Sequence, residues 1–138
     1  MSPTRLVVNV DGGARGNPGP AAIAAVLATP EGEIVDEVGQ AIGPATNNVA
    51  EYRALLLGIE RARALGASEV ELIGDSELVV RQVRGEYKVK DAELRKLYAR
   101  AVRELAELEA WSIRHVRRED NAAADALVNA TLDGDDRG

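Results

Sequence analysis

The pattern of apolar residues changes near Asn48, and this change limits the folds that the chain can adopt. Before it, three strand-length segments, at residues 5–11, 21–29 and 33–42, are joined by short turns. After it, segments with helical spacing alternate with short buried strands. Short turns join antiparallel strands, whereas strands separated by helices pair in parallel. We therefore expect an α/β fold with a mixed sheet and helices on both faces.

The remaining elements follow from spacing and from turn residues. Apolar positions from Val49 to Ala62 predict a helix that stops at Gly66. Residues 21–29 are rich in alanine and would suit a helix, but glycine and proline around them limit the segment to the length of a strand. The other predicted elements are a strand at 69–75, helices at 76–85 and 91–108, a strand at 110–116 and a helix at 121–132.

Composition narrows the classes of function. The 138 residues include no cysteine, which excludes disulfides, thiol catalysis and thiolate metal sites. The net charge of −6 argues against nucleic-acid binding through bulk electrostatics, but not against holding a polyanion through divalent cations. We find no signal peptide and no membrane-spanning run, so we expect a cytoplasmic protein without a membrane partner. Residues 1–132 are expected to form one domain, and 133–138 a disordered tail.

Four carboxylates have ordinary explanations when each is considered alone. Asp11 opens the segment DGGARGNPGP, whose glycines and prolines are typical of a turn. Glu51 lies three residues after Asn48, which is the spacing of a helix-capping box. Asp75 can cap the helix that follows it, and Asp125 can be an exposed charge on a helix. The residues alone leave these interpretations open.

Together, the four carboxylates predict a metal site. Asp11 and Asp75 each end a predicted strand, Glu51 lies in the first turn of the helix between them, and Asp125 lies one turn into the last helix. If the two strands are neighbours, their terminal carboxylates lie side by side and repel unless protonated or bridged by cations. Oxygen ligands suit Mg²⁺ or Mn²⁺, and two such ions can support phosphodiester hydrolysis.

Four segments, in this order, resemble type 1 ribonuclease H: DGGARGNPGP, TNNVAEYRALLLGI, LIGDSELVVRQV and HVRREDNAAADALVN. The resemblance covers about Arg5 to Leu132 and is nearest to compact prokaryotic and archaeal-like members without a basic protrusion. It implies the ribonuclease H-like fold, a five-stranded mixed sheet with three antiparallel strands and then two parallel ones. It also implies a metal-dependent endonuclease that hydrolyses the RNA strand of RNA–DNA hybrids, leaving 5′-phosphate and 3′-hydroxyl ends.

The resemblance also implies roles for individual residues. His115 and Arg118 match residues that assist catalysis, because a histidine can transfer a proton near neutral pH and an arginine can bind a phosphate. His115 equally suits a residue that only closes the strand. The ligands of two divalent ions match Asp11, Glu51, Asp75 and Asp125. The contacts to the hybrid match Gly12, Gly13, Asn17, Thr46, Asn47, Asn48 and Ser76, with Thr46 on a DNA phosphate.

Other functions are weighed against this one. A phosphate-binding dinucleotide loop is disfavoured, because Pro18 and Pro20 lack donors and no helix follows at once. A silent hybrid-binding module, a nuclease that also cuts double-stranded RNA, and a plain α/β domain with surface acids stay open. Glu77 stands where many relatives carry glutamine, which puts one contact to the hybrid in doubt. Trp111 is expected in the core, and the protein is expected to be a monomer without a protein partner.

Overall fold

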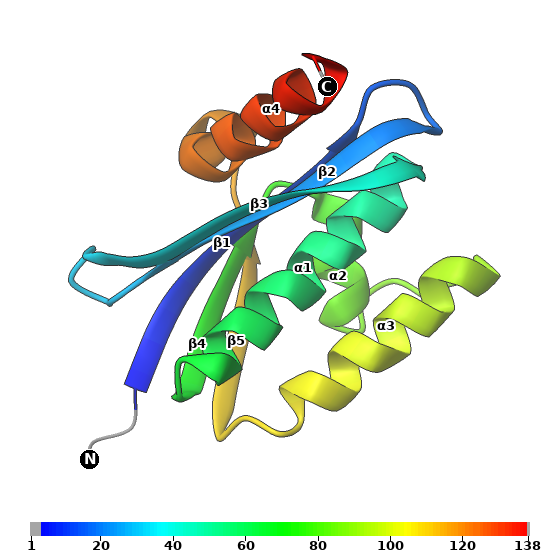
Figure 1. The fold of residues 1–138 in the computed structure, drawn as a ribbon. Coiled ribbons are helices and arrows are strands. Elements are labelled where there is room, and N and C mark those ends of the chain that lie inside the picture. The colour runs from blue at the N-terminus through cyan, green and yellow to red at the C-terminus, as the bar shows by residue number, and fades with distance from the viewer. Residues whose placement is uncertain (1–3, 138) are drawn as a thin grey trace.

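The computed structural model describes residues 4–137, which form one mixed sheet with helices on both faces (Figure 1). The sheet order is β3-β2-β1-β4-β5. Its strands are β1 (Thr4–Ala14), β2 (Gly19–Ala28), β3 (Ile34–Ala45), β4 (Ala67–Gly74) and β5 (Ala110–His115). The helices are α1 (Asn47–Ala64), α2 (Glu77–Val83), α3 (Ala92–Leu105), the short 3₁₀ helix η1 (Arg118–Asn121) and α4 (Ala122–Arg137).

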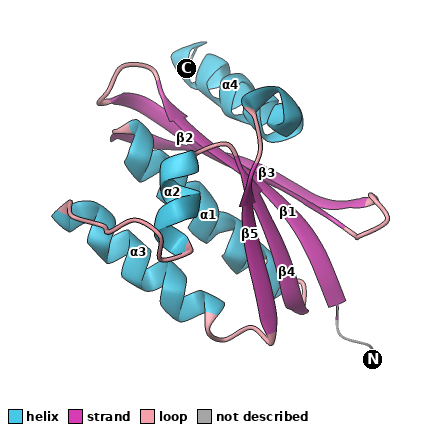
Figure 2. Cartoon of the chain, turned by 180° about the vertical axis from the view of Figure 1, so that it is seen from behind, coloured by secondary structure: helices cyan, strands magenta, loops and turns pink. Residues whose placement is uncertain are grey.

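The topology confirms the predicted mixed sheet. β1, β2 and β3 pair antiparallel, whereas β4 pairs in parallel with both β1 and β5. Helices α1, α2 and α3 cover one face, and α4 lies on the other (Figure 2). The alanine-rich segment is strand β2, and its alternate residues contribute to the apolar clusters on the two faces of the sheet. Burial on both faces explains why it lacks the alternation of a half-exposed strand.

Helix α1 packs closely against β1, because two glycines leave room for it. A Cβ atom on Gly12 would lie 2.2 Å from the carbonyl oxygen of Ala50, and one on Gly58 would lie 2.7 Å from a methyl carbon of Val10. Both distances are too short for any real side chain at these positions. The close approach places the N-terminal part of α1, with Glu51, directly against β1.

Helix α4 is attached to the sheet through a smaller apolar cluster. It contacts β1, β2 and β3. The cluster consists of Ala22 and Ala24 of β2 and of Leu127, Val128 and Leu132 of α4. The main core on the opposite face combines residues from the sheet and from α1, α2 and α3. The two faces of the sheet therefore differ in how much apolar packing holds their helices.

Most element boundaries shift relative to the prediction, and three of these differences change the role assigned to a residue or segment. β1 continues past Asp11 and pairs with β2 through Ala14, so Asp11 lies inside a strand rather than in a turn. α1 is capped by Thr46 rather than Asn48, because the Thr46 hydroxyl accepts a hydrogen bond from the Val49 amide at 3.2 Å. α4 continues beyond Leu132, its predicted end, to Arg137.

The prediction for Trp111 is wrong. Its side chain is 39% exposed, because β5 is an edge strand in which Ile113 is the buried residue. None of the helices within residues 4–137 is both long and apolar enough to cross a membrane.

Candidate metal centre and nucleic-acid interface

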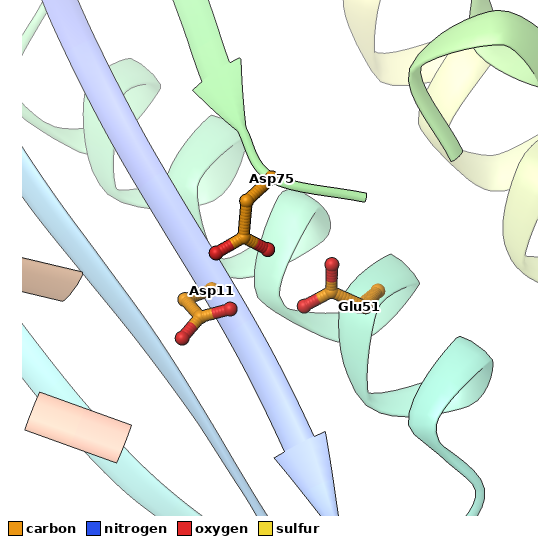
Figure 3. Close-up of side chains that lie close together, drawn as sticks. All are labelled: Asp11, Glu51 and Asp75. Atoms are coloured by element: carbon orange, nitrogen blue, oxygen red, sulfur yellow. The ribbon is translucent and has the colours of Figure 1, made fainter. Parts of the chain in front are cut away.

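Three carboxylates converge where β4 ends. Asp11 lies in β1, Asp75 directly follows β4, and Glu51 projects from α1 (Figure 3). The pairing of β1 with β4 ends at Val10 and Gly74, so Asp11 and Asp75 follow paired positions on neighbouring strands. One oxygen atom from each of the three side chains lies within 4.8 Å of the others. The predicted adjacency of the two strands is thus confirmed, and we call these residues the carboxylate trio.

The ordinary explanations for the trio are wrong. Glu51 does not complete a capping box, because its Oε1 accepts a hydrogen bond from the amide of Gly12 at 2.5 Å, across to β1. Asp75 does not cap α2, because the Ser76 side chain accepts from the amide of Val79 at 3.3 Å. Asp11 is no turn residue, because its strand continues beyond it. All three side chains are therefore free of the local backbone roles that their spacing suggested.

Burial and repulsion between neighbouring carboxylates raise the pKa of two members of the trio, Asp11 and Glu51. Asp11 is 6% exposed, and its burial, with repulsion from Asp75, raises its pKa to about 7. The pKa of Glu51 also lies well above its usual range, first through burial and then through the charges of Asp11 and Asp75. Such a cluster of carboxylates is stabilised by protonation or by a bridging cation. Its all-oxygen donor set at short mutual distance fits Mg²⁺ or Mn²⁺.

Asp125 reaches the site from α4, on the face of the sheet opposite to α1. It lies in the first turn of α4 and lines the same cavity, and its charge contributes to the raised pKa of Asp11. Its Oδ1 accepts a hydrogen bond from Nε of Arg118 at 3.1 Å, and the second guanidinium nitrogen lies at the same distance. The Arg118 side chain is 71% exposed and lines the cavity from η1. Asp125 does not belong to the tight group of three.

The four carboxylates surround an open cavity of about 550 Å³. Of the predicted site residues, it is also lined by Gly12, Gly13, Asn47, Asn48, Ser76 and Arg118. It is not lined by Asn17, Thr46 or His115. The structure thus gathers most of the predicted residues around one cavity and leaves three outside it.

The three residues outside the cavity have definite positions. Asn17 accepts a hydrogen bond from the Asn47 amide at 3.0 Å, while the Asn47 side chain accepts from the Ala14 amide at 2.9 Å. These bonds hold the β1–β2 loop against the start of α1. Thr46 lines a separate groove between the start of α1 and α3, together with Arg53 and Lys96. His115 is exposed at the end of β5, where it is paired with Gly74.

The two neighbouring glycines of the first motif face different surroundings. Gly12 has no space for a side chain, because α1 occupies it. A Cβ on Gly13 would meet only a methyl carbon of Val128, at the ordinary distance of 3.7 Å. The absence of a side chain at Gly12 therefore follows from packing, independently of any contact to a nucleic acid.

Two polar cavity residues were missed by the sequence analysis. Asn129 lines the cavity one helical turn after Asp125, and its spacing of four residues is the signal that would have found it. Arg15 also lines the cavity, and its guanidinium lies 2.6 Å from a carboxylate oxygen of Asp133 on α4. No local spacing predicts this contact, because the two residues are far apart in the sequence.

Comparisons with known proteins agree with this geometry. Residues 9–131 match a family described as "Reverse transcriptase-like". The chain is 49% identical over 129 residues to "Ribonuclease HI" of Halobacterium salinarum, covering 94% of this chain and 65% of that protein, so it spans less than two thirds of that relative. It is 35% identical over 145 residues to "Ribonuclease H" of Chromohalobacter salexigens, covering 94% of this chain and 85% of that protein.

A solved structure extends the comparison to the fold. The chain superimposes on LC11-RNase H1, solved in complex with an RNA/DNA hybrid, with a TM-score of 0.90 at 42% identity. The match covers 94% of this chain and 97% of that one. The sheet, the helices on both faces and their order therefore have a close counterpart of known structure.

Proposed function

Because the chain belongs to the ribonuclease H family, we propose that it is a metal-dependent endoribonuclease that hydrolyses the RNA strand of RNA–DNA hybrids. The products are expected to carry 5′-phosphate and 3′-hydroxyl ends. The observation that carries the proposal is the convergence of three carboxylates from β1, α1 and β4 within 4.8 Å. It is supported by the fold that the chain shares with a relative solved on an RNA/DNA hybrid.

The carboxylates would hold two divalent ions. Asp11, Glu51 and Asp75 offer ligands from one side of the cavity, and Asp125 offers one from the other. When bound, such ions supply an activated water and stabilise the charge that develops on the leaving oxygen. Asp11 and Glu51 must release their protons before they bind a cation, because burial raises the pKa of both carboxyl groups.

Arg118 would bind the phosphate at the cleavage point. Its side chain is exposed and lines the cavity, and its guanidinium can donate two parallel hydrogen bonds to phosphate oxygens. It cannot act as a base, because a guanidinium keeps its proton in proteins. His115 stands outside the cavity, beside the strand end that precedes Asp75, so it can transfer a proton only to a group that extends over this edge.

The remaining predicted contacts fit a hybrid that lies across the cavity. Gly13, Asn48 and Ser76 line it and can approach the RNA strand, whose 2′-hydroxyl distinguishes it from DNA. The neighbouring groove contains the Thr46 hydroxyl and the cationic side chains of Arg53 and Lys96, which suit a DNA phosphate. Since all these groups come from one chain, we expect the protein to act as a monomer, in the cytoplasm.

The test is strand-resolved cleavage of a hybrid whose RNA and DNA carry different labels, with Mg²⁺, with Mn²⁺ and with excess chelator. We expect cuts in the RNA strand alone, dependent on the metal and lost in Asp75→Asn. Binding of the hybrid without cleavage under either metal would favour the silent module instead. Cleavage of double-stranded RNA in parallel reactions would extend the substrate range to the broader nuclease.

A further inference from the structure

Side chains take over the hydrogen bonding of β1 at the point where β4 ends. The β1–β4 pairing stops at Val10 and Gly74, whereas β1 continues to Ala14. Just beyond this point the Gly12 amide donates to Glu51, and the Val10 carbonyl accepts a hydrogen bond from Nδ2 of Asn121 at 2.8 Å. Two groups far apart in the sequence are thus bound to β1 on either side of Asp11.

The amide of Asn121 is fixed at both ends. The residue is 2% exposed, and its Oδ1 accepts a hydrogen bond from Nδ2 of Asn9 at 2.9 Å while its own Nδ2 donates to Val10. Asn9 and Asp11 are alternate residues of one strand, so they lie on the same face of β1. A buried amide with its donor and its acceptor both engaged is held in one orientation.

The segment around Asn121 carries the charges that face the carboxylate trio. Asn121 ends η1 and directly precedes α4, so it lies between Arg118 at the start of η1 and Asp125 in the first turn of α4. The apolar cluster beneath α4 consists of small and aliphatic side chains. Such packing is not directional. The hydrogen bonds of Asn121 are directional, so they fix the position of the start of α4, which the apolar packing alone does not fix.

We propose that Asn121 is a positioning residue that sets how far Asp125 and Arg118 stand from the carboxylate trio. This inference rests on the proposed function, because it assigns Asp125 to the same pair of ions. Loss of Asn121 leaves Asp11, Glu51 and Asp75 on their own elements but lets the start of α4 shift. Divalent-ion binding then weakens and kcat for hybrid cleavage falls, while KM for the hybrid changes little.

Two substitutions and one matched control separate positioning from general loss of packing. Asn121→Ala removes both hydrogen bonds, whereas Asn121→Asp keeps the size of the side chain and replaces the donor to Val10 with an acceptor. The control is Leu127→Ala, which weakens the packing of the same helix and retains both bonds. Leu127 does not line the cavity. Thermal unfolding identifies the temperature at which all variants are folded.

The experiment is a calorimetric titration with Mn²⁺ alone, combined with a double-mutant cycle against Asp125→Asn. We expect both Asn121 variants to bind Mn²⁺ about tenfold to a hundredfold more weakly than the wild type, as is usual for groups that orient metal ligands. Leu127→Ala is expected to retain wild-type affinity. In the Asp125→Asn background, Asn121→Ala should cause no further loss, because both changes act through one carboxylate.

Wild-type Mn²⁺ affinity in a folded Asn121→Ala, or losses that multiply in the double variant, would overturn the inference. If Asn121→Ala does not fold, the isosteric Asn121→Asp takes its place in the cycle. Hybrid cleavage measured on the same samples separates the two proposals. If Asn121→Ala causes no further loss of Mn²⁺ affinity in the Asp125→Asn background but the wild type does not cleave the hybrid, the nuclease is refuted and the positioning role stands. If the wild type cleaves the hybrid but the two losses of Mn²⁺ affinity multiply, the positioning role is refuted and the nuclease stands. If the wild type does not bind Mn²⁺, both proposals are refuted.

Discussion

Both sides of the cavity carry carboxylates, but the two sides stabilise them differently. On one side, the carboxylate trio is attached to β1, β4 and α1 over the main core, and burial raises the pKa of Asp11 and Glu51. On the other side, Asp125 lies on a helix held by a smaller cluster and is paired with the exposed Arg118. Packing therefore holds the carboxylate trio together although its members repel one another. The charge of Asp125 is instead neutralised by an ion pair that lies near solvent.

The largest expected effect on cleavage comes from neutralising one member of the carboxylate trio. Glu51→Gln should reduce hybrid cleavage by about a hundredfold to a thousandfold, because a lost metal ligand removes several kcal/mol of charge stabilisation. The measurement is the initial rate at saturating Mg²⁺. Asp36→Asn, which removes a carboxylate paired with Arg61 away from the cavity, is the matched control and should retain activity. A Glu51→Gln rate close to that of the wild type would contradict the assignment.

A pair of glycine substitutions compares the packing of the two sides. Gly12→Ala should destabilise the protein by roughly 2–4 kcal/mol, because its Cβ would overlap the backbone of Ala50 on the side of α1. Gly13→Ala faces Val128 on the side of α4, at an ordinary contact distance, and should change stability by less than about 0.5 kcal/mol. The measurement is the free energy of unfolding of both variants and the wild type, obtained by denaturant titration. Equal effects would mean that α1 is not pressed against β1 as described.

The pH dependence of stability tests the raised pKa of Asp11. Its pKa lies at about 7 in the folded protein, against 3.8 ordinarily, so the folded state binds this proton more tightly than the unfolded state does. This contribution is fully present below about pH 4 and is lost as the pH rises through about 7. Without metal, Asp11→Asn should therefore be more stable than the wild type at alkaline pH, by roughly 1–3 kcal/mol. Asp125→Asn, whose carboxylate is already paired, should show no such gain.

The smallest expected effect concerns the exposed half. Arg118→Ala should slow cleavage by about tenfold through loss of hydrogen bonds to the phosphate, and leave the unfolding temperature unchanged because the ion pair with Asp125 is exposed. Arg118→Lys keeps the charge without the bidentate geometry and should restore only part of the rate. A large loss of stability in Arg118→Ala would instead assign this residue to the fold.

The carboxylate trio was accessible from the sequence because its members stand next to strands and helices with clear periodicity. What the sequence did not show depends on contacts between distant segments. The spacing of Asn48 and Glu51 suggested a capping box, but Thr46 caps the helix. The side chain of Glu51 is instead hydrogen-bonded to β1. Likewise, Trp111 resembles a core residue locally, but the position of its strand at the sheet edge leaves it exposed.

The ion pair of Arg118 with Asp125 shows the same limit. The spacing of seven residues along the chain does not reveal it, because a 3₁₀ turn and the start of a helix separate them. The role of Gly12 was also hidden, since the motif that contains it is equally typical of a turn. Close approach between α1 and β1 becomes visible only when both elements are placed.

The central claim is that the fold holds the carboxylate trio together for divalent cations. Its most direct test is thermal unfolding of the wild type and Asp11→Asn at about pH 8, first in chelator and then in saturating Mn²⁺. We predict that Mn²⁺ raises the unfolding temperature of the wild type by several degrees and that of Asp11→Asn much less. An unchanged wild-type unfolding temperature, or an equal rise in both proteins, would contradict the account.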